Sequence, residues 1–111
     1  MFKNEIAEFI YKRTYSRWRE NDKRREDGPE TIERFLSVLI SERKEIPEKT
    51  IAKTRKYLLE FSVMPSMRFL WAAGDAAKRD NTTIYNCAFA KINCVESFAE
   101  CLFILMCGTG F

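Results

Sequence analysis

The sequence predicts a mainly helical front region that leads into one strand and one apolar helix, the opening of a larger α/β structure. Three observations predict this fold class. Apolar residues recur at helical spacing through the first 64 residues. Residues 82–92 are rich in β-branched and aromatic side chains, as in a strand. Residues 95–107 then form an apolar helical segment that ends at a glycine. We therefore divide the chain into a helical region, 1–64, and the start of an α/β structure, 65–111.

The composition indicates a small globular protein. The chain has 111 residues, enough for one small domain, and 46% of them are hydrophobic and 32% charged. It has no run of about 18 apolar residues that could span a membrane, and its first residues lack the apolar core of a secretory signal. We expect a cytoplasmic location and no membrane contact.

The first helix is predicted over about residues 4–20, with Asn4 as its N-cap. Residues 19–28 are polar and highly charged, which predicts a loop. The apolar side chains of this helix lie near one side: Ile6, Phe9, Ile10 and Tyr11.

Two further helices follow in the front region. Pro29 occupies a position typical of a first helical residue. The third helix starts near Pro47 and should stop before Pro65, because a residue that precedes proline disfavours the helical conformation. The apolar sets are Ile32, Phe35, Leu36, Leu39 and Ile40 for the second helix, and Ile51, Leu58, Leu59 and Phe61 for the third.

The character of the chain changes after Val63. Residues 65–71 form a compact apolar stretch, and residues 74–81 read as a polar turn region. The strand over 82–92 comes next, and the last helix runs from about Val95 to Cys107, with Gly108 as its C-terminal stop.

This last part predicts an incomplete structure. A single strand leaves its backbone N–H and C=O groups unpaired on both sides. The apolar side chains of the last helix surround most of its circumference, as in a helix buried on several sides. They are Phe98, Cys101, Leu102, Phe103, Ile104, Leu105 and Met106. We therefore expect a fragment, or one half of a split protein.

The charged residues and cysteines leave several interpretations open. A basic cluster near the front indicates either a solvated helix face or a surface for phosphates of nucleic acid or nucleotides. The four cysteines lie in the last quarter, without a Cys-x-x-Cys pair and without any histidine, so neither a metal site nor a disulfide framework is expected. The basic cluster is Lys12, Arg13, Arg17, Arg19, Lys23, Arg24 and Arg25, and the cysteines are Cys87, Cys94, Cys101 and Cys107.

Taken singly, the candidate site residues are ambiguous. A cysteine in a strand, such as Cys87, is more often a small buried hydrophobe than a reactive thiol. Packing is the simplest role for Cys94, Cys101 and Cys107. The sequence Gly108-Thr109-Gly110 can let the backbone approach a ligand closely, although helix ends use glycine in any case. Ser66, after a proline, is typical of a turn.

Four segments, taken together and in order, resemble adenosylcobalamin-dependent (class II) ribonucleotide reductases. The resemblance covers about residues 10–111. In the family, the segment after the first strand helps to bind the allosteric nucleotide. Here that segment lacks the clear motif for it, so no effector-binding residue is assigned. The segments read Ile-Tyr-Lys-Arg-Thr-Tyr-Ser-Arg-Trp at 10–18, Met-Pro-Ser-Met-Arg-Phe-Leu-Trp at 64–71, Tyr-Asn-Cys-Ala-Phe at 85–89 and Leu-Met-Cys-Gly-Thr-Gly-Phe at 105–111.

The resemblance implies roles for particular residues. It makes residues 65–111 the start of the catalytic barrel, the ten-stranded α/β barrel of the family. Cys87 would be one of two thiols that reduce the substrate ribose, and its disulfide partner and the radical-carrying cysteine would lie outside this chain. Ser66, Asn86, Gly108 and Gly110 fall where the family lines its substrate pocket.

The resemblance also implies a cofactor and partners. Adenosylcobalamin would generate the radical and would be bound mainly by the missing part of the enzyme. The partners would be a larger C-terminal chain with the rest of the barrel, a ribonucleotide substrate, and a thioredoxin-like or other dithiol reductant. The chain would be inactive alone. The alternative hypothesis, from the residues themselves, is a stand-alone helical module that binds nucleic acid through its basic front segment.

Overall fold

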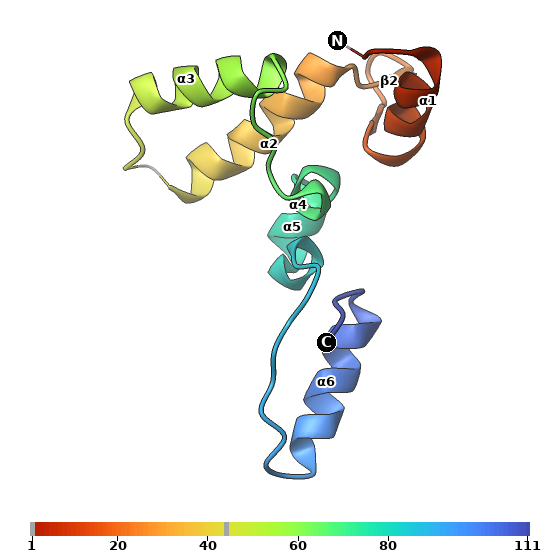
Figure 1. Ribbon diagram of the computed structural model, residues 1–111, viewed down its shortest axis with the longest axis vertical. Coiled ribbons are helices and arrows are strands. Elements are labelled where there is room, and N and C mark those ends of the chain that lie inside the picture. Colours follow the sequence, from red (N-terminus) through yellow and green to blue (C-terminus); the bar gives the residue numbers. More distant parts are fainter. Residues whose placement is uncertain (1, 44) are drawn as a thin grey trace.

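The computed structural model describes residues 2–43 and 45–111 and consists of a helical upper part and a lower limb (Figure 1). The upper part contains α1 (Glu5–Thr14), the antiparallel pair β1 (Trp18–Arg19) and β2 (Arg24–Arg25), α2 (Gly28–Glu42) and α3 (Glu48–Leu59). Two short helices, α4 (Met67–Ala72) and α5 (Asp75–Arg79), and the 3₁₀ turn η1 (Asn81–Ile84) lead to the limb, which carries α6 (Glu96–Met106). None of the described helices is both long and apolar enough to cross a membrane.

The first helix begins where the sequence predicts but ends earlier. The Asn4 side chain accepts a hydrogen bond from the Ala7 backbone N–H at 2.8 Å, which confirms it as the N-cap. The helix stops at Thr14 rather than near residue 20, and the predicted loop contains the hairpin of β1 and β2. The helix ends early because of a tertiary contact. The Ser16 hydroxyl donates to the Glu26 carbonyl oxygen at 2.7 Å, which joins the segments on either side of the hairpin.

The predicted second and third helices are confirmed. Asp27 caps α2 by accepting from the Glu30 N–H, while the Glu30 carboxylate accepts from the Asp27 N–H, which is a complete capping box. Pro29 lies in the first turn, where a missing N–H costs nothing. Helix α3 starts after Pro47 and ends at Leu59, before Pro65.

The hydrophobic core forms where α2, α3 and α4 meet. The ring of Phe69 in α4 packs edge-on against Phe35 in α2, with centroids 5.1 Å apart. Several residues predicted to be apolar contacts lie at the surface instead, including Ile6, Phe9 and Ile40. The core residues are Ile32, Phe35, Leu36, Val38, Leu58, Leu70 and Ala73. The segment after residue 64 therefore contributes directly to the core of the helical region.

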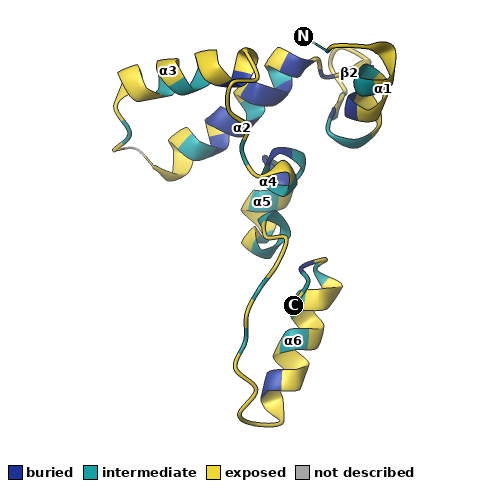
Figure 2. Cartoon of the chain, viewed as in Figure 1, coloured by how far each residue is buried: buried dark blue, intermediate teal, exposed yellow. Residues whose placement is uncertain are grey.

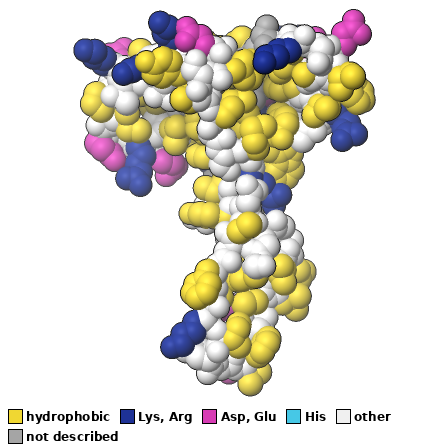
Figure 3. Space-filling view, viewed as in Figure 1, with side chains coloured by type: hydrophobic (Ala, Val, Ile, Leu, Met, Phe, Trp, Pro, Cys, Tyr) yellow, Lys and Arg dark blue, Asp and Glu magenta, His cyan; other side chains and the backbone are white. Residues whose placement is uncertain are grey.

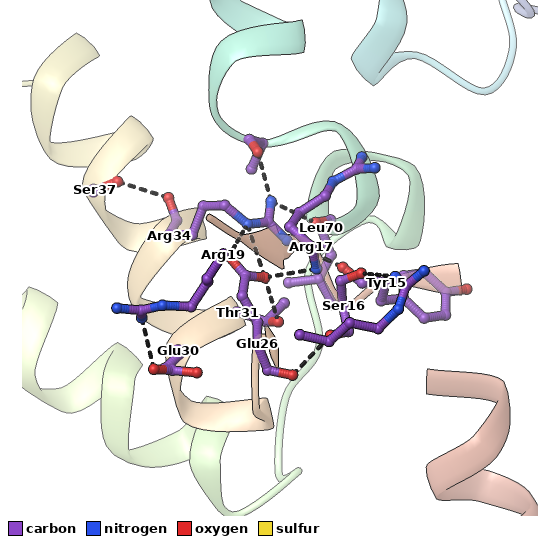
Figure 4. A network of polar contacts seen from close by, with 12 residues as sticks. Tyr15, Ser16, Arg17, Arg19, Glu26, Glu30, Thr31, Arg34, Ser37 and Leu70 are labelled. Atoms are coloured by element: carbon purple, nitrogen blue, oxygen red, sulfur yellow. Dashed lines mark hydrogen bonds and ion pairs between the residues drawn. The ribbon is translucent and has the colours of Figure 1, made fainter. Parts of the chain in front are cut away.

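A buried ion pair joins the hairpin, α2 and α4 (Figure 4). The Glu26 carboxylate accepts from the Arg34 Nε at 2.9 Å and from the Thr31 hydroxyl at 2.9 Å. The other guanidinium nitrogens of Arg34 donate to the carbonyl oxygens of Tyr15 and Ala73. One side chain thus links three segments that are distant in the sequence.

Arg34→Met is expected to lower the free energy of unfolding by about 3–5 kcal/mol, because it leaves the Glu26 carboxylate buried without its cationic partner. The matched control is Arg55→Met, which removes an exposed ion pair with Glu33 and should cost less than about 1 kcal/mol. Urea denaturation of both variants measures the difference. Equal losses would show that the buried pair has no special weight.

The segment between α4 and α6 departs most from the sequence prediction. The expected turn region contains α5, and the expected strand over 82–92 is wrong in this structure. Its first residues form η1, and the following extended segment makes only one bridge within the described residues, a parallel pair between Cys87 and Gly110. The physical reason is that no neighbouring strand among the described residues is available to pair with it.

Most residues of the lower limb are exposed (Figure 2), and many of them are apolar. Phe98 is 64% exposed, and Phe89 on the extended segment is 93% exposed. In the space-filling view, charged side chains gather over the upper part, while apolar ones dominate the limb (Figure 3). The predicted all-round apolar character of α6 is therefore confirmed, and most of its surface is uncovered.

The overall dimensions agree with this exposure. The radius of gyration is 16.6 Å, whereas a compact domain of this length has about 13 Å. The accessible surface is 8327 Å², against about 6,400 Å² for a compact monomer of the same mass. The limb contributes to this excess, because none of its described residues belongs to the hydrophobic core cluster.

Candidate functional site

The candidate site lies where the end of α6 returns to the extended segment below η1. The Gly110 N–H donates to the Asn86 carbonyl oxygen at 2.9 Å, and the Ala88 N–H donates to the Gly110 carbonyl oxygen at 2.7 Å. These two bonds lie on either side of Cys87 and fix its backbone against the glycine loop, residues 108–110.

Thr109 fixes the glycine loop through a buried hydroxyl. Its side chain is almost fully buried, and its hydroxyl lies 3.0 Å from the Tyr85 carbonyl oxygen and 3.3 Å from that of Thr82. A hydroxyl held between two carbonyl groups replaces the strand pairing that this segment lacks. The glycine loop is therefore attached to both η1 and the residues before Cys87.

Gly108 has a conformation that other residues rarely adopt. Its φ is +88°, in the left-handed region, as predicted for a helix stop. A Cβ atom at this position would lie 2.3 Å from the Arg68 Nη2. Gly110 is less restricted, since its nearest neighbour would be the Asn86 carbonyl oxygen at 3.7 Å.

The Cys87 thiol is accessible. The side chain is exposed, and it lines a pocket of about 340 Å³ with Thr82, Tyr85, Ala88, Ile104 and Thr109. The pocket size is at the lower limit of about 300–1,000 Å³ for small-molecule sites. Cys87 is thus fixed through its backbone, while its side chain remains accessible.

The structure brings four of the five predicted site residues together. Asn86, Cys87, Gly108 and Gly110 all belong to the bridged region. Ser66 instead caps α4, accepting from the Phe69 N–H at 3.4 Å. Its connection to the others is indirect, through Arg68 in the first turn of the same helix.

Sequence reasoning missed two residues of this region. Arg68 lies in the segment 64–71, and its guanidinium donates to the carbonyl oxygens of Thr83 and Gly108 at 3.0 and 2.9 Å. Thr109 was noted only as the spacer between two glycines. Spacing in the sequence does not reveal either contact, because both join segments 15 or more residues apart.

The other cysteines are placed differently from Cys87. Cys94 was expected to pack in an interior, but it is exposed, with its sulfur 3.2 Å from the Ser97 hydroxyl. Cys101 and Cys107 are half-buried. Only Cys87 combines exposure with a backbone held by the glycine loop.

Most of the basic front cluster is already paired within the chain. Arg19 and Arg24 contact the Glu30 carboxylate at 2.6 and 2.7 Å. The hydrogen bond from Arg24, together with that from the Asp27 N–H, lowers the pKa of Glu30 to about 2. Burial lowers the pKa of Arg17, whose guanidinium bonds to the Trp71 carbonyl and lies over the Trp71 ring. The geometry favours an internal structural role and disfavours the nucleic-acid hypothesis.

The pocket beside Cys87 is too small for adenosylcobalamin. A corrin cofactor is larger than the drug-sized ligands that pockets of about 300–1,000 Å³ accept. The pocket beside Cys87 has only about 340 Å³. The chemistry assigned below to the residues of this chain therefore does not involve contact with this cofactor.

Comparisons with known proteins point to one family. Residues 1–75 match the family model described as ribonucleotide reductase alpha domain. A putative adenosylcobalamin-dependent ribonucleoside-triphosphate reductase of Mycobacterium phage D29 is 36% identical in an alignment 84 residues long that covers 73% of this chain. The adenosylcobalamin-dependent ribonucleoside-triphosphate reductase of Lactobacillus gasseri is 32% identical in an alignment 100 residues long that covers 79% of the chain. The alignments span 11% and 13% of these two relatives. No solved structure matches the chain significantly.

Proposed function

Since the chain belongs to the ribonucleotide reductase alpha domain family, we propose that it is part of an adenosylcobalamin-dependent ribonucleotide reductase and supplies Cys87 as one of its two reducing thiols. The observation that carries the proposal is the bridge between Cys87 and Gly110, which fixes the backbone of an exposed thiol. The substrate class is the ribonucleoside triphosphate, as named for the relatives.

The chemistry of this site is a two-electron reduction. The ribose exchanges its 2′-hydroxyl for hydrogen, and the hydroxyl leaves as water. Cys87 and a second cysteine on the larger chain lose two electrons and two protons between them and form a disulfide. A dithiol reductant of the thioredoxin type then restores both thiols. A cytoplasmic location suits this cycle, because thiols stay reduced there.

Each local residue has a part in this proposal. In this proposal Asn86, Gly108 and Gly110 lie beside the substrate, next to the residues that line the pocket at Cys87. Ser66 caps α4, and Arg68 in the first turn of that helix is hydrogen-bonded to Gly108 in the glycine loop. Holding the thiol at a fixed position supplies orientation, which accounts for a large part of many catalytic effects.

The rest of the enzyme would provide what this chain lacks. The exposed apolar side chains of α6 and of the extended segment form the surface on which a larger chain, carrying the remaining barrel and the cofactor site, is expected to pack. Residues 1–64 form the helical region that flanks the barrel, and residues 65–111 open it.

Mixing the chain with a larger chain that carries the rest of the barrel tests the proposal. We expect the two to copurify and to form deoxyribonucleotides together, while the 111-residue chain alone shows neither turnover nor micromolar binding of adenosylcobalamin. The proposal would be contradicted if the 111-residue chain is monodisperse, folds cooperatively and does not bind the larger chain.

A further inference from the structure

Arg68 connects three segments around the candidate site. Its Nε donates to the Thr83 carbonyl oxygen in η1 at 3.0 Å. Its Nη2 donates to the carbonyl oxygens of Gly108 at 2.9 Å and Cys107 at 3.4 Å. The guanidinium also lies 5.3 Å from the centre of the Trp71 ring in its own helix. The Trp71 ring therefore supports the Arg68 guanidinium, while its nitrogens bind η1 and the segment at the end of α6.

The carbonyl groups of Cys107 and Gly108, which follow the C-terminal end of α6, need a hydrogen-bond donor. Cys107 is the C-cap of α6, and the last carbonyl groups of a helix lack partners within the helix. They also lie at the negative end of the helix dipole, where a cation is stabilising. A guanidinium satisfies both needs, because it carries a positive charge and its donors lie in one plane.

The same loop holds Cys87. Gly108 is bonded to Arg68, Thr109 to the carbonyl oxygens before Cys87, and Gly110 to the backbone on either side of it. A shift of the loop at Gly108 must therefore change the bridge at Gly110 and, with it, the backbone of Cys87.

We propose that Arg68 is a positioning residue that sets the place of the Cys87 thiol by fixing the end of α6 and the glycine loop. It acts through the backbone of residues 107–110 and does not itself touch the substrate. This inference rests on the proposed redox function of Cys87, but its structural part can be measured separately.

The structural part is tested by amide hydrogen exchange in the assembled enzyme with Arg68→Met. Loss of charged hydrogen bonds should speed exchange at the Ala88 and Gly110 amides by about tenfold or more, while the core amide of Leu36 stays unchanged. The control is Arg55→Met, which removes an exposed ion pair far from the loop in sequence and should leave all three rates unchanged. A uniform rise at all three amides in Arg68→Met would reduce Arg68 to a general stability role and overturn the inference.

The functional part is tested by steady-state kinetics of the same enzyme. Arg68→Met should lower kcat by about tenfold to a hundredfold, the scale of a small misplacement of a reacting group, with KM changed little. Arg68→Lys should recover only part of kcat, since one ammonium group cannot bond in a fixed plane to both Thr83 and Gly108. Full recovery by lysine, or unchanged kcat in an enzyme whose loop exchange has risen, would refute positioning of the thiol.

Failure of the proposed function gives a different result. If the wild-type assembly shows no reductase turnover, the alkylation rate of Cys87 replaces kcat as the readout. Arg68→Met should then change that rate at least several-fold, on the scale of one lost charged hydrogen bond, while Arg55→Met leaves it unchanged. An alkylation rate indifferent to Arg68 would overturn the inference without reference to ribonucleotide reduction.

Discussion

Replacing Cys87 with serine is expected to lower multiple turnover of the assembled enzyme by about three orders of magnitude or more, the scale seen when a member of a covalent machinery is removed. A serine hydroxyl cannot form the disulfide that supplies the two electrons. The fold should survive, because the side chain is exposed and the bridge to Gly110 uses only backbone atoms. Turnover with a dithiol reductant, together with hydrogen exchange of the bridge, measures both effects.

The remaining cysteines provide matched controls for this substitution. Cys101→Ser and Cys107→Ser should retain turnover and lose on the order of 1 kcal/mol of stability, because each half-buried site would receive a more polar group. Cys94→Ser should have little effect on either property, since this thiol is exposed. Full turnover by Cys87→Ser, or loss of turnover in Cys94→Ser, would contradict the assignment of Cys87 as the redox thiol.

A carboxylate on the exposed face of α6 is expected to weaken association with the larger chain by about a hundredfold or more. Phe98 and Leu102 are 64% and 58% exposed and lie one helical turn apart, on one face. Each would lose about 1.5–3 kcal/mol of hydrophobic burial in the complex, and a buried unpaired carboxylate costs more. The measurement is the dissociation constant of Phe98→Glu and of Leu102→Glu.

The control for these variants adds the same charge elsewhere. Ser37→Glu places a carboxylate on an exposed position of α2, in the part of the chain that forms its own core. Its dissociation constant should match that of the unmodified chain. If all three variants bind the larger chain equally well, α6 is not the docking surface, and its exposed apolar residues need another explanation.

Local signals in the sequence predicted the helices with strong ends. Asn4, Pro29, Pro47 and Gly108 each act through the conformation of their own segment, so their effects do not depend on distant residues. The capping box at Asp27 belongs to the same class of signal and could have been recognised from its spacing to Glu30.

Elements fixed by tertiary contacts were not predictable in this way. The early end of α1 and the hairpin after it depend on Glu26, a single buried carboxylate that binds Arg34 and the backbone of Arg17. Residues 82–92 have strand composition, but a strand needs a neighbour. Within the part of the chain that the structure describes, this segment pairs only with Gly110. Composition reports a preference, whereas pairing decides the structure.

The candidate site shows the same division. Cys87, Asn86, Gly108 and Gly110 were identified through resemblance to a family, and the bridge brings them together. Arg68 and Thr109 act on carbonyl groups of other segments, and backbone acceptors have no sequence signature. Their roles become visible only when the chain is folded.

The most direct measurement is to map the disulfide formed when the assembled enzyme turns over once without a reductant. Mass spectrometry of the digested protein identifies which two cysteines are joined. The account predicts one disulfide per site that links Cys87 to a cysteine of the larger chain, in an amount equal to the deoxyribonucleotide formed. A disulfide that omits Cys87, or product formed while Cys87 remains a free thiol, would contradict it.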